Sequence, residues 1–455
     1  MKFEKEVIID APCNEVFSFH ERKGALKRLS PPWQNIEVVW EKGGILPGGE
    51  VKMNMHDSIR IPWQARHIEY EKNSFFSDIQ ISGPFSSWAH EHYFNLIDEK
   101  KTLMKDSIEC SLPLSGLTKI FNPIIRKKLE RIFFYRHKIL KRDMSLNMKY
   151  PVKKKILISG GSGLLGQMLN HRLSTAGHDV RFLIRRPPKQ ENEFLWNPDK
   201  RYVDMKAFNN IDAVINLSGE PIGEGIWTKL KKERIEKSRI VTASFISEII
   251  SCLDSPPELF ISSSATGYYG NRHEEILSEE SEKGDLFISK ICDKWEKAAL
   301  SYVNDKTRTV LLRTGIVLSP EGGALPLIWK SVLAGFPVIP GRGDQYISWI
   351  SSEDWLKIVY HLIFESSIDG AVNAVSPSPV TLSKLIKTMS KIYKRPAIFN
   401  IPESIFSFFG GKKAYETILC GAKVLPLKLQ KEGFSFFHNN LEDALVEMLG
   451  KEVNS

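Results

Sequence analysis

The chain has 455 residues, of which 42% are hydrophobic and 26% charged, a composition typical of globular proteins that argues against disorder. The length exceeds the roughly 250–300 residues at which a single core stops growing, so two or three domains are expected. The formal net charge of +9 admits an anionic partner, whereas five scattered cysteines form no CxxC pair and no metal-ligand spacing.

Residues 1 to about 142 are predicted to be mostly β-structure. Strand-like segments recur between turn signals, and a short helix is expected near Glu15 to His20, after Pro12. The segments are KFEKEVIID, NIEVVWEKG, RIPWQARHIEYE and LMKDSIECSLP. The first of them has no long apolar core, so it resembles neither a signal peptide nor an anchor, and no run approaches the ~20 apolar residues of a membrane span. A cytoplasmic location follows, and a reducing compartment suits the cysteines.

A basic amphipathic helix is predicted over residues 117 to 142. Its apolar positions recur at helical spacing: Phe121, Ile124, Ile125, Leu129, Ile132 and Phe133. Three alternative roles are open for the basic residues of this helix: they form a solvated outer face, they contact a membrane surface, or they contact nucleic acid. A curved antiparallel sheet gripping this helix would bury both apolar faces and enclose a cavity.

After the polar stretch from Asn147 to Lys154, apolar strands alternate with helices. KILISG, DVRFLIR, DAVINLSG and ELFISSSA are strand-like and have helical segments between them. This βαβα pattern predicts a doubly wound α/β domain with a parallel sheet covered on both faces. From about residue 320, Pro- and Gly-rich turns separate shorter elements, which predict a small C-terminal substrate lobe.

A glycine-rich turn, SGGSGLLG at residues 159–166, joins the first of these strands to the helix after it. In that context Gly160 permits the tight turn, Gly163 lets backbone N–H groups approach a pyrophosphate, and Gly166 lets helix and strand pack closely. Leu164 and Leu165 belong to the same helix N-terminus, where unpaired N–H groups and the dipole favour an anion. The alternative is a tight turn without a ligand.

Two arginines stand at the end of the second parallel strand, where an acidic residue would hydrogen-bond the ribose of NAD. Arg185 and Arg186 instead match a phosphate, so they favour NADP, unless both are solvated loop residues.

These motifs resemble the extended short-chain dehydrogenase/reductase superfamily and, within it, the NAD-dependent epimerase/dehydratase-like proteins of uncertain substrate. The resemblance covers residues 153 to 448 and rests on the glycine turn together with DAVINLSGEPIGEGIWTKLKKERIEKSRI, SATGYYG, RTGIVLSPEGGALP, GRGDQYISWISSEDW and VLPLKLQKEGFSF. FHERKGALKRLSPPW is similar to the START-like (SRPBCC, polyketide-cyclase-like) domain that precedes the module in some members. The resemblance implies a START-like α+β helix-grip domain at 1–145 and a Rossmann-like NADP-binding domain at 153–450.

The resemblance also assigns roles to single residues. It implies that Gly160, Gly163, Gly166 and Arg185 contact the cofactor. It implies further that the third-strand segment Asn216, Leu217, Ser218 and Gly219 lines the edge near the ribose. Ser264 falls where the superfamily's active-site hydroxyl lies, at the crevice beyond the carboxyl ends of the strands. The alternative for Ser264 is a hydroxyl bonded to a neighbouring backbone carbonyl.

The chain departs from the superfamily at its acid/base pair. A tyrosine followed four residues later by a lysine is usual, but this chain reads Phe287 to Cys292 as FISKIC. Phenylalanine has no proton to donate, so the usual general acid is missing. Tyr269 is a candidate substitute for the proton and Lys290 for the charge, against ordinary packing and surface roles.

Three other polar residues draw attention. Arg342, in a polar loop near Trp349, is either a partner for an anionic substrate group or a solvated arginine. Asp354 is expected to cap a helix or to lie in its first turn. His20 is expected at a cavity mouth, most simply as a hydrogen-bonded structural histidine.

The sequence leaves three functional hypotheses. The first is an NADP-dependent oxidoreductase or nucleotide-sugar-epimerase-like enzyme acting on a small carbonyl or alcohol. The second is a non-catalytic NADP-binding sensor whose START-like cavity holds an apolar ligand, favoured by the missing tyrosine and lysine. The third, ranked last, is membrane or nucleic-acid association through the basic helix. The substrate and the oligomeric state are left open.

Overall fold

A computed structural model describes residues 1–56, 60–114, 118–396, 399–402, 404–405, 413 and 415–451. Leu117, the first residue of the predicted basic helix, lies outside this part of the chain. The chain divides into two compact units. Among the described residues, the first unit contains those of 1–153, 170–178 and 447–451, and the second contains those of 154–169 and 179–446.

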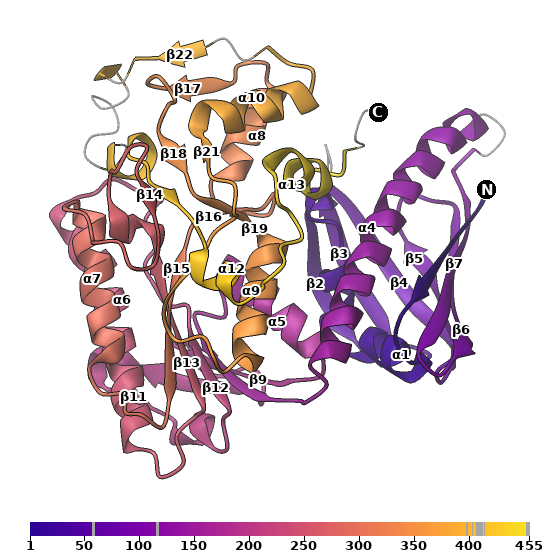
Figure 1. Cartoon of the computed structure of the whole chain (residues 1–455). Coiled ribbons are helices and arrows are strands. Elements are labelled where there is room, and N and C mark those ends of the chain that lie inside the picture. The colour runs from indigo at the N-terminus through magenta and orange to yellow at the C-terminus, as the bar shows by residue number, and fades with distance from the viewer. Residues whose placement is uncertain are drawn as a thin grey trace. The chain divides into compact units, whose positions relative to one another are not determined.

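The first unit is built on a seven-stranded antiparallel sheet in the order β1-β7-β6-β5-β4-β3-β2 (Figure 1). Its strands are β1 (Lys2–Ile9), β2 (Ile36–Lys42), β3 (Glu50–His56), β4 (Arg60–Glu71), β5 (Phe75–Ser82), β6 (Ser87–Asp98) and β7 (Lys101–Ser111). The short helices α1 (Cys13–Glu21) and α2 (Ala25–Leu29) connect β1 to β2, together with the 3-10 turn η1 (Pro32–Gln34). The predicted β-structure and the helix near Glu15 to His20 are confirmed, but the structure also contains α2 and the strands β3, β5 and β6, which were not predicted from the sequence.

The predicted basic helix is present as α4 (Asn122–Lys149), which follows the 3-10 turn η2 (Lys119–Phe121). Leu129 and Phe133 are buried against the sheet, as expected, but Phe121 and Ile124 are exposed. The prediction was wrong for these two residues: Phe121 lies in η2, before the helix, and Ile124 lies on the exposed side of the first turn of α4, whereas Ile125 packs against the cluster. It was also incomplete for the basic face, since Arg136 and Arg142 are half-buried.

Helix α4 continues seven residues past its predicted end at residue 142 because polar residues of its last two turns are buried. Asp143 is 1% exposed and accepts bonds of 2.7 and 2.8 Å from the Arg28 guanidinium. Arg172, in a segment that belongs to the same unit, lies 3.3 Å from Asp143 and donates to Asn147. A sequence pattern that counts polar residues as exposed cannot anticipate such pairs.

The second unit contains an eight-stranded sheet in the order β11-β10-β9-β8-β12-β13-β15-β20. The strands are β8 (Lys155–Ser159), β9 (Asp179–Ile184), β10 (Glu193–Asn197), β11 (Tyr202–Val203), β12 (Ala213–Asn216), β13 (Leu259–Ala265), β15 (Arg308–Thr314) and β20 (Gly370–Ala374). All pairs are parallel except β10 with β11. The chain passes from β8 to β9 on one side and to β12 on the other, which creates the switch point where such sheets bind ligands.

Helices and 3-10 turns connect these strands. The helices are α5 (Leu164–Thr175), α6 (Lys229–Cys252), α7 (Phe287–Leu300) and α9 (Ser352–Phe364), and the turns are η3 (Pro198–Lys200), η4 (Met205–Phe208) and η5 (Thr266–Tyr269). Buried residues of β12, β13, α6 and α7 form one apolar cluster around Phe260 and Trp295. The predicted Rossmann-like α/β fold is confirmed for this part of the chain.

Short elements follow β15, as predicted. Helices α8 (Leu325–Leu333) and α10 (Leu382–Ile392) gather with two-stranded sheets near the top of Figure 1. These sheets pair β16 (Ile316–Leu318) with β19 (Trp349–Ser351), β17 (Val338–Pro340) with β22 (Phe399–Ile401), and β18 (Tyr346–Ile347) with β21 (Val380–Thr381). β14 (Ile276–Leu277) pairs with β23 (Lys423–Val424), and a π-helical turn (Tyr415–Leu419), α12 (Leu427–Lys431) and α13 (Leu441–Met448) complete the described chain.

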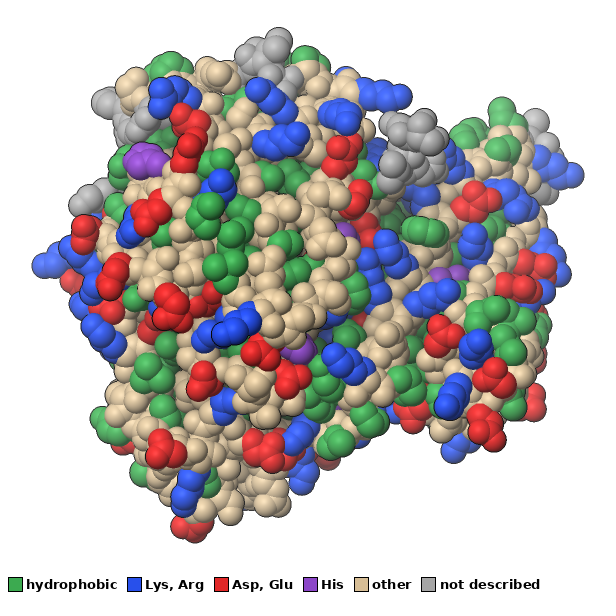
Figure 2. Space-filling model, viewed as in Figure 1, with side chains coloured by type: hydrophobic (Ala, Val, Ile, Leu, Met, Phe, Trp, Pro, Cys, Tyr) green, Lys and Arg blue, Asp and Glu red, His purple; other side chains and the backbone are tan. Residues whose placement is uncertain are grey.

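Positive and negative side chains are intermixed on the face drawn in Figure 2, where Lys and Arg lie among Asp and Glu. Within the part of the chain that the structure describes, no helix is both long and apolar enough to cross a membrane.

Candidate functional site

The glycine turn lies directly between β8 and α5, at the switch point of the sheet. Gly160 has a φ of +77°, and a Cβ on it would lie 2.7 Å from the Leu217 carbonyl carbon. A Cβ on Gly166 would lie 2.5 Å from the Gly160 carbonyl oxygen. Both glycines are therefore required by the chain itself, Gly160 for its backbone conformation and the close approach of β12, and Gly166 for helix packing.

Gly163 differs from these two glycines. The nearest heavy atom to a Cβ on Gly163 is 3.5 Å away, an ordinary van der Waals distance. The first intrahelical bond of α5 joins the Gln167 N–H to the Gly163 carbonyl, so the amides of Leu164 and Leu165 lie in the turn whose N–H groups have no helical acceptor. A Cβ at position 163, next to this helix end, would therefore make no clash with the protein.

The end of β12 lies beside the glycine turn. The side-chain oxygen of Asn216 accepts bonds from the Ser159 hydroxyl at 2.7 Å and from the Ser218 N–H at 3.2 Å. The Asn216 Nδ2 is buried and has no hydrogen-bond partner within the described structure. Leu217 closes over Gly160, and Gly219 packs against the Arg239 guanidinium. The structure thus brings Asn216, Leu217 and Ser218 beside the glycine turn, whereas Gly219 is shown only against Arg239 of α6.

The two arginines after β9 are in different environments. Arg186 donates to the Glu193 carboxylate at 2.5 and 2.8 Å and so is already paired. Arg185 is exposed, and no hydrogen bond or ion pair joins it to another described residue. Of the two, Arg185 is the guanidinium available to an external phosphate.

Ser264, at the carboxyl end of β13, is 4% exposed and donates to Glu296 Oε1 at 2.5 Å. Glu296, on α7, also accepts two bonds from the Arg313 guanidinium, at 2.9 Å from Nε and 2.8 Å from Nη2. Arg313 ends β15 and is 5% exposed. The Ser264 hydroxyl is therefore bonded to a buried ion pair and not to a backbone carbonyl.

Tyr269 is in the same network. Its hydroxyl accepts a bond from Arg313 Nη1 at 3.0 Å and donates to Asn373 Oδ1 at 2.7 Å. The side chain is fully buried, and burial raises its pKa to about 12 despite the neighbouring guanidinium. A hydroxyl with these two partners and this pKa stays protonated near neutral pH.

Lys290 lies apart from this network. It is exposed in the first turns of α7, whereas Ser264 and Tyr269 are buried. Phe287, at the position of the missing tyrosine, packs edge-on against Trp227 with ring centroids 5.4 Å apart. The structure thus brings together two of the three predicted catalytic residues.

Sequence reasoning missed Glu296, Glu279 and Asn373. Arg313 donates to the backbone carbonyl of Glu279. The side-chain carboxylate of Glu279 accepts the backbone N–H of Asn373 at 3.1 Å. The detectable signal was Glu296 itself, an acid on the buried face of α7. Conversely, Arg342 is exposed and paired with Asp344, and Trp349 is fully buried. These two residues therefore do not form a substrate-binding site together in the described structure.

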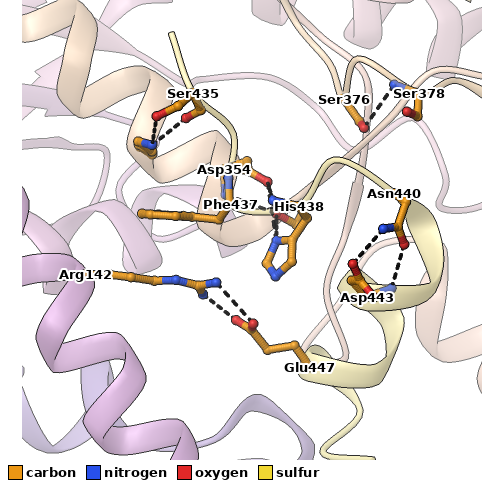
Figure 3. A network of polar contacts seen from close by, with 12 residues as sticks. Arg142, Asp354, Ser376, Ser378, Ser435, Phe437, His438, Asn440, Asp443 and Glu447 are labelled. Carbon is orange, nitrogen blue, oxygen red and sulfur yellow. Dashed lines mark hydrogen bonds and ion pairs between the residues drawn. The ribbon is translucent and has the colours of Figure 1, made fainter. Parts of the chain in front are cut away.

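Asp354 lies in the first turn of α9, as expected, and Ser351 is the capping residue of this helix. Figure 3 shows Asp354 beside Phe437 and His438. Its carboxylate accepts the backbone N–H groups of Phe437 at 2.6 Å and His438 at 3.1 Å. The His438 ring contacts the Ser351 hydroxyl at 2.9 Å. Asp354 therefore fixes the segment before α13 to α9.

The comparisons with known proteins agree with this architecture. The model of the NAD dependent epimerase/dehydratase family matches residues 156–373, and that of a domain of unknown function matches residues 401–448. An epimerase family protein of Mycobacterium bovis is 34% identical over 290 residues, which cover 64% of this chain and 96% of the relative. The chain belongs to the NAD-dependent epimerase/dehydratase family. The glycine turn, the β12 edge and the Ser264 network all lie within the residues that the family model matches.

Two solved structures of epimerase proteins are similar to this family member. A nucleoside-diphosphate sugar epimerase from Corynebacterium glutamicum has a TM-score of 0.79 at 27% identity and covers 98% of this chain and 90% of its own. The human epimerase family protein SDR39U1, solved with NADPH, has a TM-score of 0.60 at 28% identity. This human match covers 65% of the present chain and 99% of the human one.

Proposed function

We propose that the second unit binds NADP at the glycine turn and transfers hydride between the nicotinamide and a small carbonyl or alcohol substrate. The observation that carries the proposal is Gly163, which neither backbone conformation nor packing requires. A glycine that the chain itself does not need is explained by a ligand that approaches the backbone closely. The pyrophosphate would lie against the free amides of Leu164 and Leu165.

Two further features support this cofactor. The unpartnered Asn216 Nδ2 offers a buried donor at the edge where the resemblance expects the ribose. The unpaired guanidinium of Arg185 fits the phosphate that distinguishes NADP from NAD. The human relative was solved with NADPH, which agrees with this choice.

The substrate is expected beyond the carboxyl ends of β13 and β15, with Ser264 near its reacting oxygen and Tyr269 and Lys290 as the proton-transfer candidates. The cofactor supplies the hydride, so the protein's part is to orient the substrate and to move one proton. Because the Corynebacterium relative is a nucleoside-diphosphate sugar epimerase, a nucleotide sugar is the first substrate class to test.

A thermal-shift experiment tests the cofactor. NADPH should raise the melting temperature of the wild type by binding the native state, and Gly163→Asp should abolish the shift because a carboxylate would occupy the phosphate position. Gly223→Asp is the matched control, since Gly223 is exposed with nothing within 4 Å of an added Cβ. No shift with millimolar NADPH, or equal shifts in both variants, would reject the site.

The preference for NADP over NAD is tested separately. Arg185→Ala should weaken NADPH binding and leave NADH binding nearly unchanged, because only NADPH carries the extra phosphate. Lys189→Ala, which removes another exposed cation of the same loop, is the control. If both variants weaken NADPH equally, the effect is general electrostatics and not recognition.

A second candidate function is an NADP-binding sensor without turnover. It is favoured by the network that already engages the hydroxyls of Ser264 and Tyr269 with Glu296, Arg313 and Asn373. The two functions differ in one measurement, which is oxidation of bound NADPH across a panel of carbonyl compounds and nucleotide sugars, followed by absorbance. Turnover that is lost in Ser264→Ala and kept in Lys189→Ala would reject the sensor.

We also propose that residues 1–145 form a START-like domain that holds an apolar ligand, ahead of the cofactor domain at 153–450 and its C-terminal lobe. The support is the seven-stranded antiparallel sheet with the 28-residue helix α4. The Corynebacterium match, which spans 98% of the chain, agrees with it. A cytoplasmic location belongs to the same proposal, because the five cysteines form no disulfide within the described structure.

A further inference from the structure

A buried cluster of histidines and aspartates interrupts the apolar interface between the sheet and α4 in the first unit. Side chains alternate along a strand, so Trp88, His90, His92 and Phe94 of β6 share one face. Phe94 belongs to one apolar cluster and Trp88 packs against another, and the two histidines lie between them. The polar residues His90 and His92 thus occupy positions on a face of the sheet that elsewhere supplies apolar side chains to the core of the first unit.

The neighbouring strands supply two carboxylates at this level of the sheet. Asp78 of β5 pairs in register with His90, and Asp106 of β7 pairs with His92. Asp78 Oδ2 lies 3.6 Å from His90 Nδ1 and 3.9 Å from His92 Nε2. One ligand atom of each of these three residues lies within 4.8 Å of the other two.

Asp106 faces the opposite nitrogen of each ring. Its Oδ1 lies 3.2 Å from His90 Nε2 and 2.7 Å from His92 Nδ1. Asp106 is fully buried, and its second oxygen lies 2.7 Å from His137 Nε2 of α4. Asp106 is therefore hydrogen-bonded to His90 and His137 and lies in close contact with His92, whose Nδ1 makes no hydrogen bond of good geometry within the described structure. A carboxylate in this place resembles the second-shell carboxylates that hold metal-binding histidines.

This arrangement leaves no proton between the Asp78 carboxylate and the two imidazole nitrogens that face it, His90 Nδ1 and His92 Nε2. His90 donates its Nε2 N–H to Asp106 and so presents a bare lone pair on Nδ1. A proton on His92 Nδ1, 2.7 Å from the Asp106 oxygen, likewise leaves a bare lone pair on His92 Nε2. The lone pairs of His90 Nδ1 and His92 Nε2 both face the Asp78 carboxylate, which is also an acceptor. Three acceptors that converge in a buried place repel one another unless a cation lies between them.

We propose that Asp78, His90 and His92 bind a divalent first-row transition metal such as Zn²⁺, with at least one coordination position left open. Two imidazoles and one carboxylate are the ligand set of open, three-residue metal sites. Metal bonds of about 2.0–2.1 Å separate tetrahedral ligands by about 3.4 Å. The two separations from Asp78, 3.6 and 3.9 Å, therefore need to shorten by about 0.2 and 0.5 Å.

The surroundings of the cluster agree with a cation. Arg136 of α4 interacts electrostatically with both aspartates, but two carboxylates against one guanidinium leave a net negative charge when the imidazoles are neutral. His20 of α1 lies beside His92 with ring centroids 6.2 Å apart. Its Nδ1 donates to the Val16 carbonyl at 2.8 Å, and its Nε2 is buried without a hydrogen-bond partner.

Protonation of the histidines is the competing way to supply positive charge. His92 is 3% exposed and His90 is 7% exposed, and their ring centroids lie 3.8 Å apart, so protonating both rings would bury two adjacent cations. A metal ion satisfies the three converging acceptors without placing several charged imidazoles side by side.

The test uses the full-length protein, freed of metal with a chelator and then titrated with Zn²⁺. The wild type should bind one Zn²⁺ per chain with a dissociation constant below about 1 μM, and Co²⁺ should give the absorption of a tetrahedral or five-coordinate site. Asp78→Asn keeps the side-chain size and should weaken binding at least about 10-fold, and Asp106→Asn should weaken it about 10–100-fold through ring orientation.

The control is His56→Gln, which removes an exposed histidine that contacts Glu37 in the same sheet. It should bind Zn²⁺ as the wild type does. Folding of each variant is checked by circular dichroism. X-ray absorption of the wild-type zinc complex should detect two imidazoles and no sulfur, which keeps the proposal testable if a variant fails to fold.

Three outcomes would overturn the proposal. These are less than about 0.1 Zn²⁺ bound per folded wild-type chain under stoichiometric conditions, unchanged affinity in folded Asp78→Asn, or sulfur ligation in the X-ray absorption spectrum.

Discussion

Replacing Arg313 by methionine removes the centre of the buried network around Ser264. The guanidinium donates to both oxygens of Glu296, to the Tyr269 hydroxyl and to the Glu279 carbonyl. Without it, the Glu296 carboxylate remains buried with the Ser264 hydroxyl as its one remaining donor in the described network. Breaking a buried ion pair from one side costs about 3–5 kcal/mol. At about 2–4 °C per kcal/mol, the second unit should lose roughly 6–20 °C in melting temperature.

A double-mutant cycle separates the pair from the rest of the network. Glu296→Leu alone should also destabilise strongly, because it leaves the guanidinium partly unpaired. Arg313→Met combined with Glu296→Leu should recover much of the loss, since no unpaired charge remains. The expected coupling energy is about 2 kcal/mol or more, measured from urea midpoints at unchanged slope.

The exposed pair of Arg272 with Glu275 is the control, and Arg272→Met should shift the urea midpoint only slightly. Two results would refute this reasoning. One is a loss below about 1 kcal/mol in Arg313→Met, and the other is simple additivity in the double variant.

Three further predictions concern single residues. Burial and nearby cations hold the pKa of His178 at about 3, below the 6.5 of an unfolded chain. The contribution of neutral His178 to the free energy of unfolding should therefore be complete above pH 6.5 and fall as the pH drops from 6.5 towards 3. His178→Gln should flatten this pH dependence of the urea midpoint. Because the pKa of Tyr269 is about 12, Tyr269→Phe should leave the shape of the pH profile of any NADPH oxidation unchanged between about pH 6 and 9, and a limb lost there would show that Tyr269 titrates in this range, against the raised pKa. Ser351→Ala removes the cap of α9 and should cost about 1–2 kcal/mol by urea denaturation, whereas an unchanged midpoint would contradict the capping role.

The sequence by itself determined the features that depend on neighbouring residues. The glycine turn was predictable because Gly160, Gly163 and Gly166 lie within one strand-turn-helix segment whose backbone needs are local. The parallel sheet was predictable because strands buried on both faces are apolar throughout. The early helix α1 and the long helix α4 followed from helical spacing, although the end of α4 did not, since Asp143 is buried by partners elsewhere in the chain.

Only the tertiary structure decided which polar groups meet. Ser264 and Glu296 are 32 residues apart and Tyr269 and Asn373 are 104 apart, so no local pattern could reveal that these side chains share one buried network. The histidines of β6 were visible in the sequence as an alternating pair. These histidines face Asp78 and Asp106 only because of the register of β5, β6 and β7. That register is set by hydrogen bonds between segments that are distant in the sequence. Local conformational preference therefore specified where a cofactor turn can form, and long-range packing specified which side chains are free to act beside it.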